Sequence, residues 1–174
     1  ASLCRDLKKK SKYEKIYGYD QDVDIMKFAL DNNFVHDIKK DLNEGIENSD
    51  LIVLCVPVYS IINILDEIKI FFNSNKVFTD TLSSKSIILK YLADNKISNT
   101  QNFILSHPMA GTENFGIRSS QENLFNEAAT FICKLESSDN DKVDEVKAMW
   151  RSVNCHIISE DAINHDRVLA ALSH

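Results

Sequence analysis

Short, continuously apolar runs alternate along the chain with longer segments in which apolar residues recur at every third or fourth position. The clearest run is Leu51–Val56, which follows the turn residues Asn48–Asp50 and ends at Pro57. A continuous run of this kind is typical of a parallel strand that is buried on both faces. In Gln21–Asn32 the apolar residues stand at near-helical spacing instead, which predicts a helix.

The two patterns predict an α/β fold in which strands and helices alternate. Strands are expected at 15–19, 34–38, 51–56, 76–79, 102–106, 130–135 and 155–159. Helices are expected at 2–12, 21–32, 59–72, 84–93, 141–153 and 162–174. This alternation predicts a doubly wound, mainly parallel sheet with right-handed crossovers.

Composition and charge narrow the class of protein. The 174 residues, 44% hydrophobic and 26% charged, match one globular domain. A net charge of -6 leaves no broad basic face, so we expect no nucleic-acid partner. The longest strongly apolar run, 51–59, is about half as long as a membrane-spanning helix, and no basic-then-apolar leader opens the sequence. We therefore expect a cytoplasmic protein without a membrane partner.

The cysteines do not form a metal-binding pattern. Cys4, Cys55, Cys133 and Cys155 stand far apart, with no CxxC pair among them. Cys55 and Cys133 lie in apolar strand-like runs, so we expect reduced, buried thiols and no metal site.

Polar or conformationally restricted residues follow several predicted strands. Asp20 comes directly after the first strand, where an acidic side chain either accepts the ribose hydroxyls of a nucleotide or makes an ordinary turn. Val56 ends the apolar run and Pro57 follows it, beside a possible cofactor crevice or simply at a helix start. The segment Thr79–Lys85, which contains Ser83, either reaches the same ligand or caps the next helix.

The most specific stretch is SHPMAGTENFG, from Ser106 to Gly116. Pro108 restricts His107 to extended backbone angles, which holds its imidazole in one direction at the end of a strand. A histidine is largely neutral at pH 7 and can accept a proton from a hydroxyl, although a buried histidine can also serve only the backbone. His165 and His174 stand half a turn apart on the last helix, so they need not act as a pair.

Several segments, in order and spacing, resemble the nucleotide-binding half of the prephenate and arogenate dehydrogenases. They are ASLCRDLKK, IYGYD, SDLIVLCVP, TDTLSSK, SHPMAGTENFG with NLFNEA, and NHDRVLAALSH. The resemblance implies a Rossmann-like fold and oxidative decarboxylation of prephenate to 4-hydroxyphenylpyruvate with reduction of NAD, in tyrosine biosynthesis. Arogenate as substrate and NADP as cofactor remain alternatives.

The resemblance also assigns roles to residues. It implies that His107 accepts the proton of the substrate's ring hydroxyl and that Ser83 contacts the same hydroxyl and the nicotinamide. Asp20 corresponds to the ribose acceptor, and Val56 and Pro57 lie beside the cofactor. Thr112, Glu113, His165 and His174 match positions on the substrate side. Leu82 stands where the family usually has glycine.

The resemblance further implies how the domains are arranged. Residues 1–160 would form a dinucleotide-binding domain whose first strand and glycine-rich loop precede the sequence, which leaves a gap in the sheet. Residues 161–174 would begin a helical domain through which the full-length protein forms a homodimer. Other dehydrogenases on this scaffold, such as hydroxy-acid dehydrogenases or imine reductases, and a non-catalytic nucleotide-sensing domain are the competing interpretations.

Overall fold

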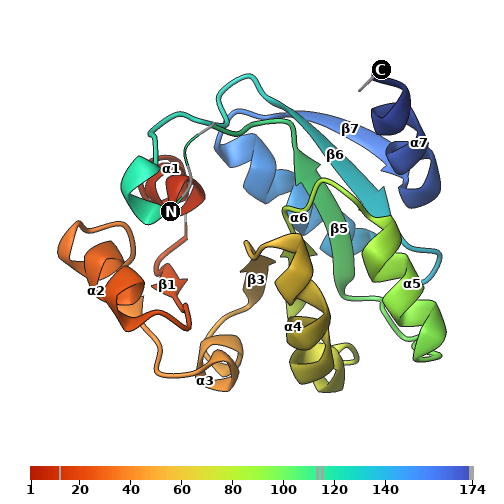
Figure 1. Cartoon of the computed structure of the whole chain (residues 1–174), viewed down its shortest axis with the longest axis horizontal. Coiled ribbons are helices and arrows are strands. Elements are labelled where there is room, and N and C mark those ends of the chain that lie inside the picture. The colour runs from red at the N-terminus through yellow and green to blue at the C-terminus, as the bar shows by residue number, and fades with distance from the viewer. Residues whose placement is uncertain (12, 113, 115, 173–174) are drawn as a thin grey trace.

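The computed structural model describes residues 1–11, 13–112, 114 and 116–172, and in it helices cover both faces of a central sheet (Figure 1). The strands are β1 Tyr17–Gly18, β2 Asp37–Ile38, β3 Leu51–Leu54, β4 Val77–Asp80, β5 Phe103–Pro108, β6 Ala129–Lys134 and β7 His156–Asp161. The α-helices are α1 Ser2–Lys10, α2 Val23–Asp31, α3 Leu42–Glu47, α4 Ile61–Ile68, α5 Ser86–Asp94, α6 Asn140–Ser152 and α7 Ala162–Leu172. Three short 3₁₀ turns are η1 Val58–Ser60, η2 Lys69–Phe71 and η3 Ile117–Ser119.

The described strands form two separate sheets. β1 pairs with β2, and the larger sheet has the order β3-β4-β5-β6-β7. The predicted gap in the sheet is therefore confirmed, and it separates β1 and β2 from the larger sheet. All pairs are parallel except β5 and β6, which run antiparallel. The expectation of parallel crossovers fails at this pair, because between β5 and β6 the described chain forms only the short turn η3 and no crossover helix.

Two hydrophobic clusters hold the layers together. On one face, α4 and α5 pack on the sheet through Ile61, Leu65 and Ile88 among others, and Ala162 at the start of α7 joins the same cluster. On the other face, α1 and α6 pack around the fully buried Trp150. Each layer of helices buries one apolar stripe against the strands, which is why the strands between them carry near-continuous apolar runs.

Two expectations about burial are corrected, and one helix was missed. β3 is an edge strand of the larger sheet, so Leu51, Ile52 and Val53 are only half-buried and only Leu54 is buried. Cys55, just beyond that edge strand, is exposed, whereas Cys133 is buried as expected. The helix α3 was not predicted, because its six residues are too few to show a helical period.

The helices have the lengths and compositions of core-packing elements. Of the described residues, none belongs to a helix that is both long enough and apolar enough to cross a lipid bilayer.

Candidate active site

The site is centred on His107, near the carboxyl end of β5. Along this strand side chains alternate between the two faces of the sheet, and His107 points to the α7 face together with Phe131 of β6. Its ring stacks on Phe131, with ring centroids 6.5 Å apart and planes inclined by 21°. His107 is 8% exposed. It is the next-to-last residue of β5, so the prediction that it stands at the end of a strand is confirmed.

A second histidine completes the environment of this ring. His165 lies in the first half of α7 and is fully buried, with its ring edge-on to both His107 and Phe131. The Nε2 atom of His165 is 3.0 Å from Nδ1 of His107. The other nitrogen of His165, Nδ1, is 2.8 Å from Oδ1 of Asp166. The three side chains therefore form a continuous hydrogen-bonded chain from a carboxylate to the ring of His107.

Asp166 also caps helix α5. Its carboxylate accepts hydrogen bonds from the backbone amides of Lys85 and Ser86 and from the hydroxyl of Ser84. Burial raises the pKa of Asp166, but the hydrogen bonds from Lys85, His165, Ser86 and Ser84 outweigh burial and lower it to about 2. This carboxyl is therefore an anion at neutral pH.

A buried ion pair supports the loop that carries Ser83. Lys85 and Asp80 both have fully buried side chains, and their charged atoms are in direct contact. Lys85 also donates to the backbone oxygen of Ser106 at 2.7 Å, and Asp80 accepts from the amides of Leu82 and Ser106. Burial raises the pKa of Asp80, and the Lys85 cation opposes that rise. The pair ties the loop after β4 to the residue that precedes His107.

The surroundings of His107 favour its neutral form. Burial lowers its pKa from 6.5 to about 4; the Lys85 cation and His165 act in the same direction, and Asp166 opposes them. At neutral pH the imidazole is therefore uncharged. Among the described residues, only His165 hydrogen bonds to this ring, and the contact is made at Nδ1 of His107. A neutral imidazole with one nitrogen engaged can accept a proton on the other.

The other predicted site residues lie on the loops that follow the strands. Ser83 is exposed on the loop between β4 and α5, between Leu82 and the hydrogen-bonded Ser84. Leu82 is buried in the core without a positive φ, so packing accounts for a leucine at this position. Thr112 is half-buried on the loop after β5, where its hydroxyl donates to the backbone oxygen of Asn114 at 2.8 Å.

The remaining predicted cofactor residues lie just beyond β1 and β3. Asp20 is exposed just beyond β1, and its Oδ1 accepts from the amide of Asp22 at 2.9 Å. Val56 is half-buried and Pro57 exposed after β3, and Pro57 also precedes the turn η1, as a helix start would require. Figure 1 shows β1 and α7 at opposite sides of the molecule. Glu113 and His174 lie outside the described residues.

Three polar residues of the site were not predicted as such. Asp80, Lys85 and Asp166 make the ion pair and the cap described above, and Asp80 and Lys85 are fully buried. Two local signals could have found them. An aspartate ends the apolar strand that precedes the loop, with a lysine five positions later, and an aspartate follows the histidine of α7 directly.

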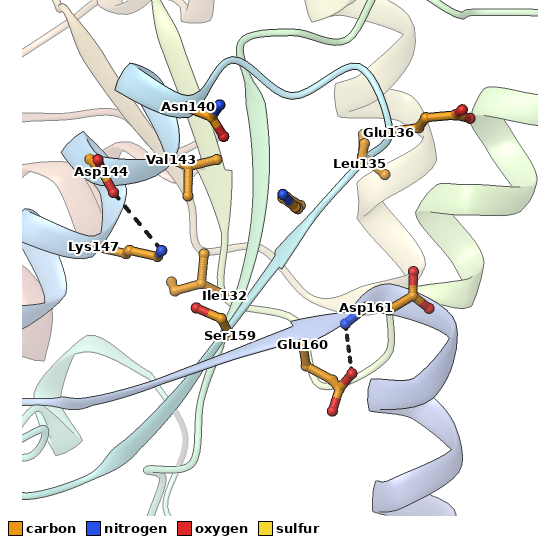
Figure 2. A pocket seen from close by; sticks show the side chains of 11 residues that line it. Ile132, Leu135, Glu136, Asn140, Val143, Asp144, Lys147, Ser159, Glu160 and Asp161 are labelled. Atoms are coloured by element: carbon orange, nitrogen blue, oxygen red, sulfur yellow. Dashed lines mark hydrogen bonds and ion pairs between the residues drawn. The ribbon is translucent and has the colours of Figure 1, made fainter.

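A separate hollow lies on the opposite face of the sheet. Figure 2 shows it between α6 and the strands β6 and β7. Its volume is about 750 Å³. Ile132 and Val143, which belong to the α6-side cluster, line its floor, and Lys147 and Asp144 form an ion pair of 3.9 Å at its side. Its lining contains no histidine and no residue of the His107 network. We therefore do not assign the chemistry to it.

The fold and the site together define the class of the protein. A mainly parallel doubly wound sheet with a polar cluster near the strand ends is the architecture of nucleotide-binding dehydrogenase domains. Residues 3–159 match the family model described as "Prephenate dehydrogenase, nucleotide-binding domain". The chain therefore belongs to the prephenate dehydrogenase family.

Individual relatives agree with this assignment. The chain is 30% identical over 176 residues to the prephenate dehydrogenase of Lactococcus lactis, covering 100% of this chain and 47% of that protein. It superposes on the arogenate dehydrogenase of Synechocystis with a TM-score of 0.88 and 25% identity, over 99% of this chain and 60% of that one. A prephenate dehydrogenase from A. aeolicus, solved with hydroxyphenyl propionate and NAD+, gives a TM-score of 0.85 at 23% identity over 97% and 58%. The chain spans about half the length of the curated relatives it matches.

Proposed function

We propose that the protein is an NAD-dependent oxidoreductase that converts prephenate into 4-hydroxyphenylpyruvate and carbon dioxide, on the route to tyrosine. The observation that carries this proposal is the buried, neutral His107 beside His165 near the end of β5. Membership of the prephenate dehydrogenase family supplies the substrate class. A base near the sheet edge is the one group this chemistry requires of the protein besides orientation of the reactants.

In the proposed reaction, Nε2 of His107 accepts the proton of the hydroxyl on the substrate ring. Bound NAD would accept the hydride from the carbon that carries this hydroxyl. As that hydrogen leaves, the hydroxyl becomes strongly acidic, so even a base whose pKa is about 4 can take the proton. Loss of the ring carboxylate as carbon dioxide then makes the ring aromatic, and the proton on His107 returns to the phenolate oxygen. Atoms and charges balance over these steps.

The residues of the chain fit the cofactor at its adenosine end and along the strand edge. The carboxylate of Asp20 is exposed just beyond β1, and among the described residues only the amide of Asp22 hydrogen bonds to it, at Oδ1. Such a carboxylate would accept the ribose hydroxyls and would repel a 2′-phosphate, which favours NAD over NADP. Val56 and Pro57, after β3, would lie against the cofactor on its apolar side.

Other residues of the site would bind the substrate. Ser83, exposed on the loop held by the Asp80–Lys85 pair, would contact the reacting hydroxyl and the nicotinamide. Thr112, together with Glu113 and His174, would lie at the entrance of the site or on the substrate side. His165 would act behind His107, not on the substrate directly, since its side chain is fully buried.

Arogenate is the second candidate substrate, because a solved relative of high structural similarity is an arogenate dehydrogenase. We further propose that residues 1–160 form the cofactor domain and that 161–174 begin a helical domain that mediates a homodimer. The large apolar side chains Ile163 and Val168 on α7, 56% and 41% exposed, support this. We also propose a cytoplasmic location.

The test is a turnover assay of the full-length protein with prephenate and with arogenate, each in the presence of NAD and of NADP. We expect the reduced cofactor to form with prephenate and NAD. Turnover with arogenate alone would transfer the proposal to the second substrate. Cofactor binding without turnover on either substrate would contradict the proposed function and favour a nucleotide-sensing role.

A further inference from the structure

We propose that Asp166, acting through His165, sets the tautomer of His107 so that the Nε2 atom of His107 is unprotonated and ready to accept a proton. The inference rests on the proposed function, because it assigns a positioning role to Asp166 and His165 in that same site. Three steps lead from the hydrogen bonds to the tautomer.

The first step concerns the carboxylate. Oδ2 of Asp166 accepts from the amide of Ser86 at 2.8 Å, the amide of Lys85 at 3.1 Å and the hydroxyl of Ser84 at 3.0 Å. Oδ1 accepts from the Lys85 amide at 2.9 Å and faces Nδ1 of His165 at 2.8 Å. Backbone amides can only donate, so these partners require an ionised carboxylate that accepts on both oxygens.

The second step concerns His165. Because Oδ1 of Asp166 can only accept, Nδ1 of His165 must carry the hydrogen in their contact. The side chain of His165 is fully buried beside Phe131 and His107, and charging it there would require desolvating a cation. The neutral form of His165 carries its hydrogen on Nδ1 in this contact, so its Nε2 can only accept.

The third step concerns His107. Its Nδ1 lies 3.0 Å from Nε2 of His165, which carries a lone pair and no hydrogen. A hydrogen bond at this contact therefore requires the hydrogen to sit on Nδ1 of His107. Because a neutral imidazole carries only one hydrogen on its two nitrogens, Nε2 of His107 is then unprotonated. A free histidine side chain favours the opposite tautomer, so the Asp166–His165 pair selects the form that general-base chemistry needs.

The cap of α5 alone does not explain this arrangement. The cap consists of the hydrogen bonds from the amides of Lys85 and Ser86 to Asp166. The contact between Oδ1 of Asp166 and His165 is not needed for it. Asp139 provides a comparison, since it caps α6 through the amide of Asp141, and among the described residues its side chain hydrogen bonds to backbone alone. The same substitution at the two caps therefore separates a structural role from a positioning one.

The first measurement is the tautomer itself. We would label the protein with ¹⁵N-histidine and record two-bond ¹H–¹⁵N correlations at neutral pH, assigning His107 by the signal lost in His107→Asn. The proposal expects the hydrogen of His107 on Nδ1. A hydrogen on Nε2 in the unmodified protein would overturn it, whatever the behaviour of any variant.

The second measurement compares Asp166→Asn with Asp139→Asn. In Asp166→Asn the amide oxygen must stay with the backbone donors, so its NH₂ faces Nδ1 of His165 and reverses both tautomers. We expect kcat to fall at least about a hundredfold, with the KM and the Kd for NAD changed less than about threefold, and the His107 hydrogen to move to Nε2. Asp139→Asn should leave all of these values unchanged.

The outcomes separate this inference from the proposed function. If the unmodified protein turns over neither prephenate nor arogenate, the proposed function fails. If it does turn over substrate but Asp166→Asn keeps its kcat and its tautomer, the inference fails and Asp166 is only a helix cap. An Asp166→Asn variant that does not fold leaves the tautomer of the unmodified protein as the deciding result.

Discussion

Removing the buried lysine of the site is the perturbation whose size follows most directly from the structure. The side chains of Lys85 and Asp80 are both 0% exposed, and Lys85 also donates to the backbone oxygen of Ser106 at 2.7 Å. In Lys85→Met the carboxylate of Asp80 stays buried without its counter-charge. Breaking such a pair from one side costs about 3–5 kcal/mol of the free energy of unfolding, because one charge is left uncompensated.

The length of the chain determines how far this loss of unfolding free energy lowers Tm. For a domain of this length about 1 kcal/mol lowers Tm by about 2–4 °C, so Lys85→Met should lower Tm by about 6–20 °C. The double variant Asp80→Asn/Lys85→Met should recover at least half of the loss, because no charge then remains buried. The pKa of His107 should rise in Lys85→Met, since the Lys85 cation helps to lower it.

Urea and thermal unfolding of the three proteins, with an NMR titration of His107, would check this prediction. A loss below about 1 kcal/mol in Lys85→Met would refute the reasoning, because the buried carboxylate would then have found water or another partner. A double variant less stable than Lys85→Met would refute it as well. Lys90→Met is the matched control, because its pair with Asp94 is exposed, and it should change Tm by less than about 2 °C.

Three further predictions follow from other contacts. The pKa of His107 is lowered to about 4, so the stability that its neutral form contributes is complete above pH 6.5 and falls by about 3 kcal/mol by pH 4. Urea unfolding of His107→Asn should lack this loss between pH 6.5 and pH 4, and an equal loss of unfolding free energy in both proteins would contradict the prediction. Trp150→Phe removes the indole donor to the hydroxyl of Ser106 at 3.0 Å and should cost about 1–3 kcal/mol by thermal unfolding, whereas an unchanged Tm would contradict it. Asp20→Ala should raise the Kd for NAD about tenfold or more by calorimetry and raise the Kd for NADP less, whereas equal changes would contradict the ribose contact.

The arrangement of the main strands was predictable from the sequence because it depends on local signals. The apolar runs before Pro57 and before His107–Pro108 predict two strands, and both strands are confirmed. Their ends differ from the prediction, since β3 ends at Leu54 and β5 at Pro108. The direction of β6 was not predictable, because an apolar run has the same pattern whichever way the strand runs. The burial of β3 was overestimated for a related reason, since a sequence run does not tell which strand lies at an edge.

The partners of His107 depend on contacts between distant segments. His165 was matched to the substrate side, and its spacing was compared with that of His174, but the structure pairs it with His107, 58 residues away. Asp166 reaches back about 80 residues to cap α5, so no local spacing relates the two. Lys85 belongs to the segment 79–85, for which ligand contact and helix capping were both left open, yet it is fully buried because Asp80 and the Ser106 carbonyl satisfy it.

The account depends most on His107 as the group that takes the proton. The direct test is the kcat of His107→Asn for prephenate with NAD, measured beside the Kd for NAD in the same protein. The account predicts about a thousandfold loss of kcat with an unchanged Kd, because the asparagine cannot accept the proton and the substitution leaves the proposed cofactor-binding residues in place. A kcat within a few-fold of the unmodified protein would contradict it.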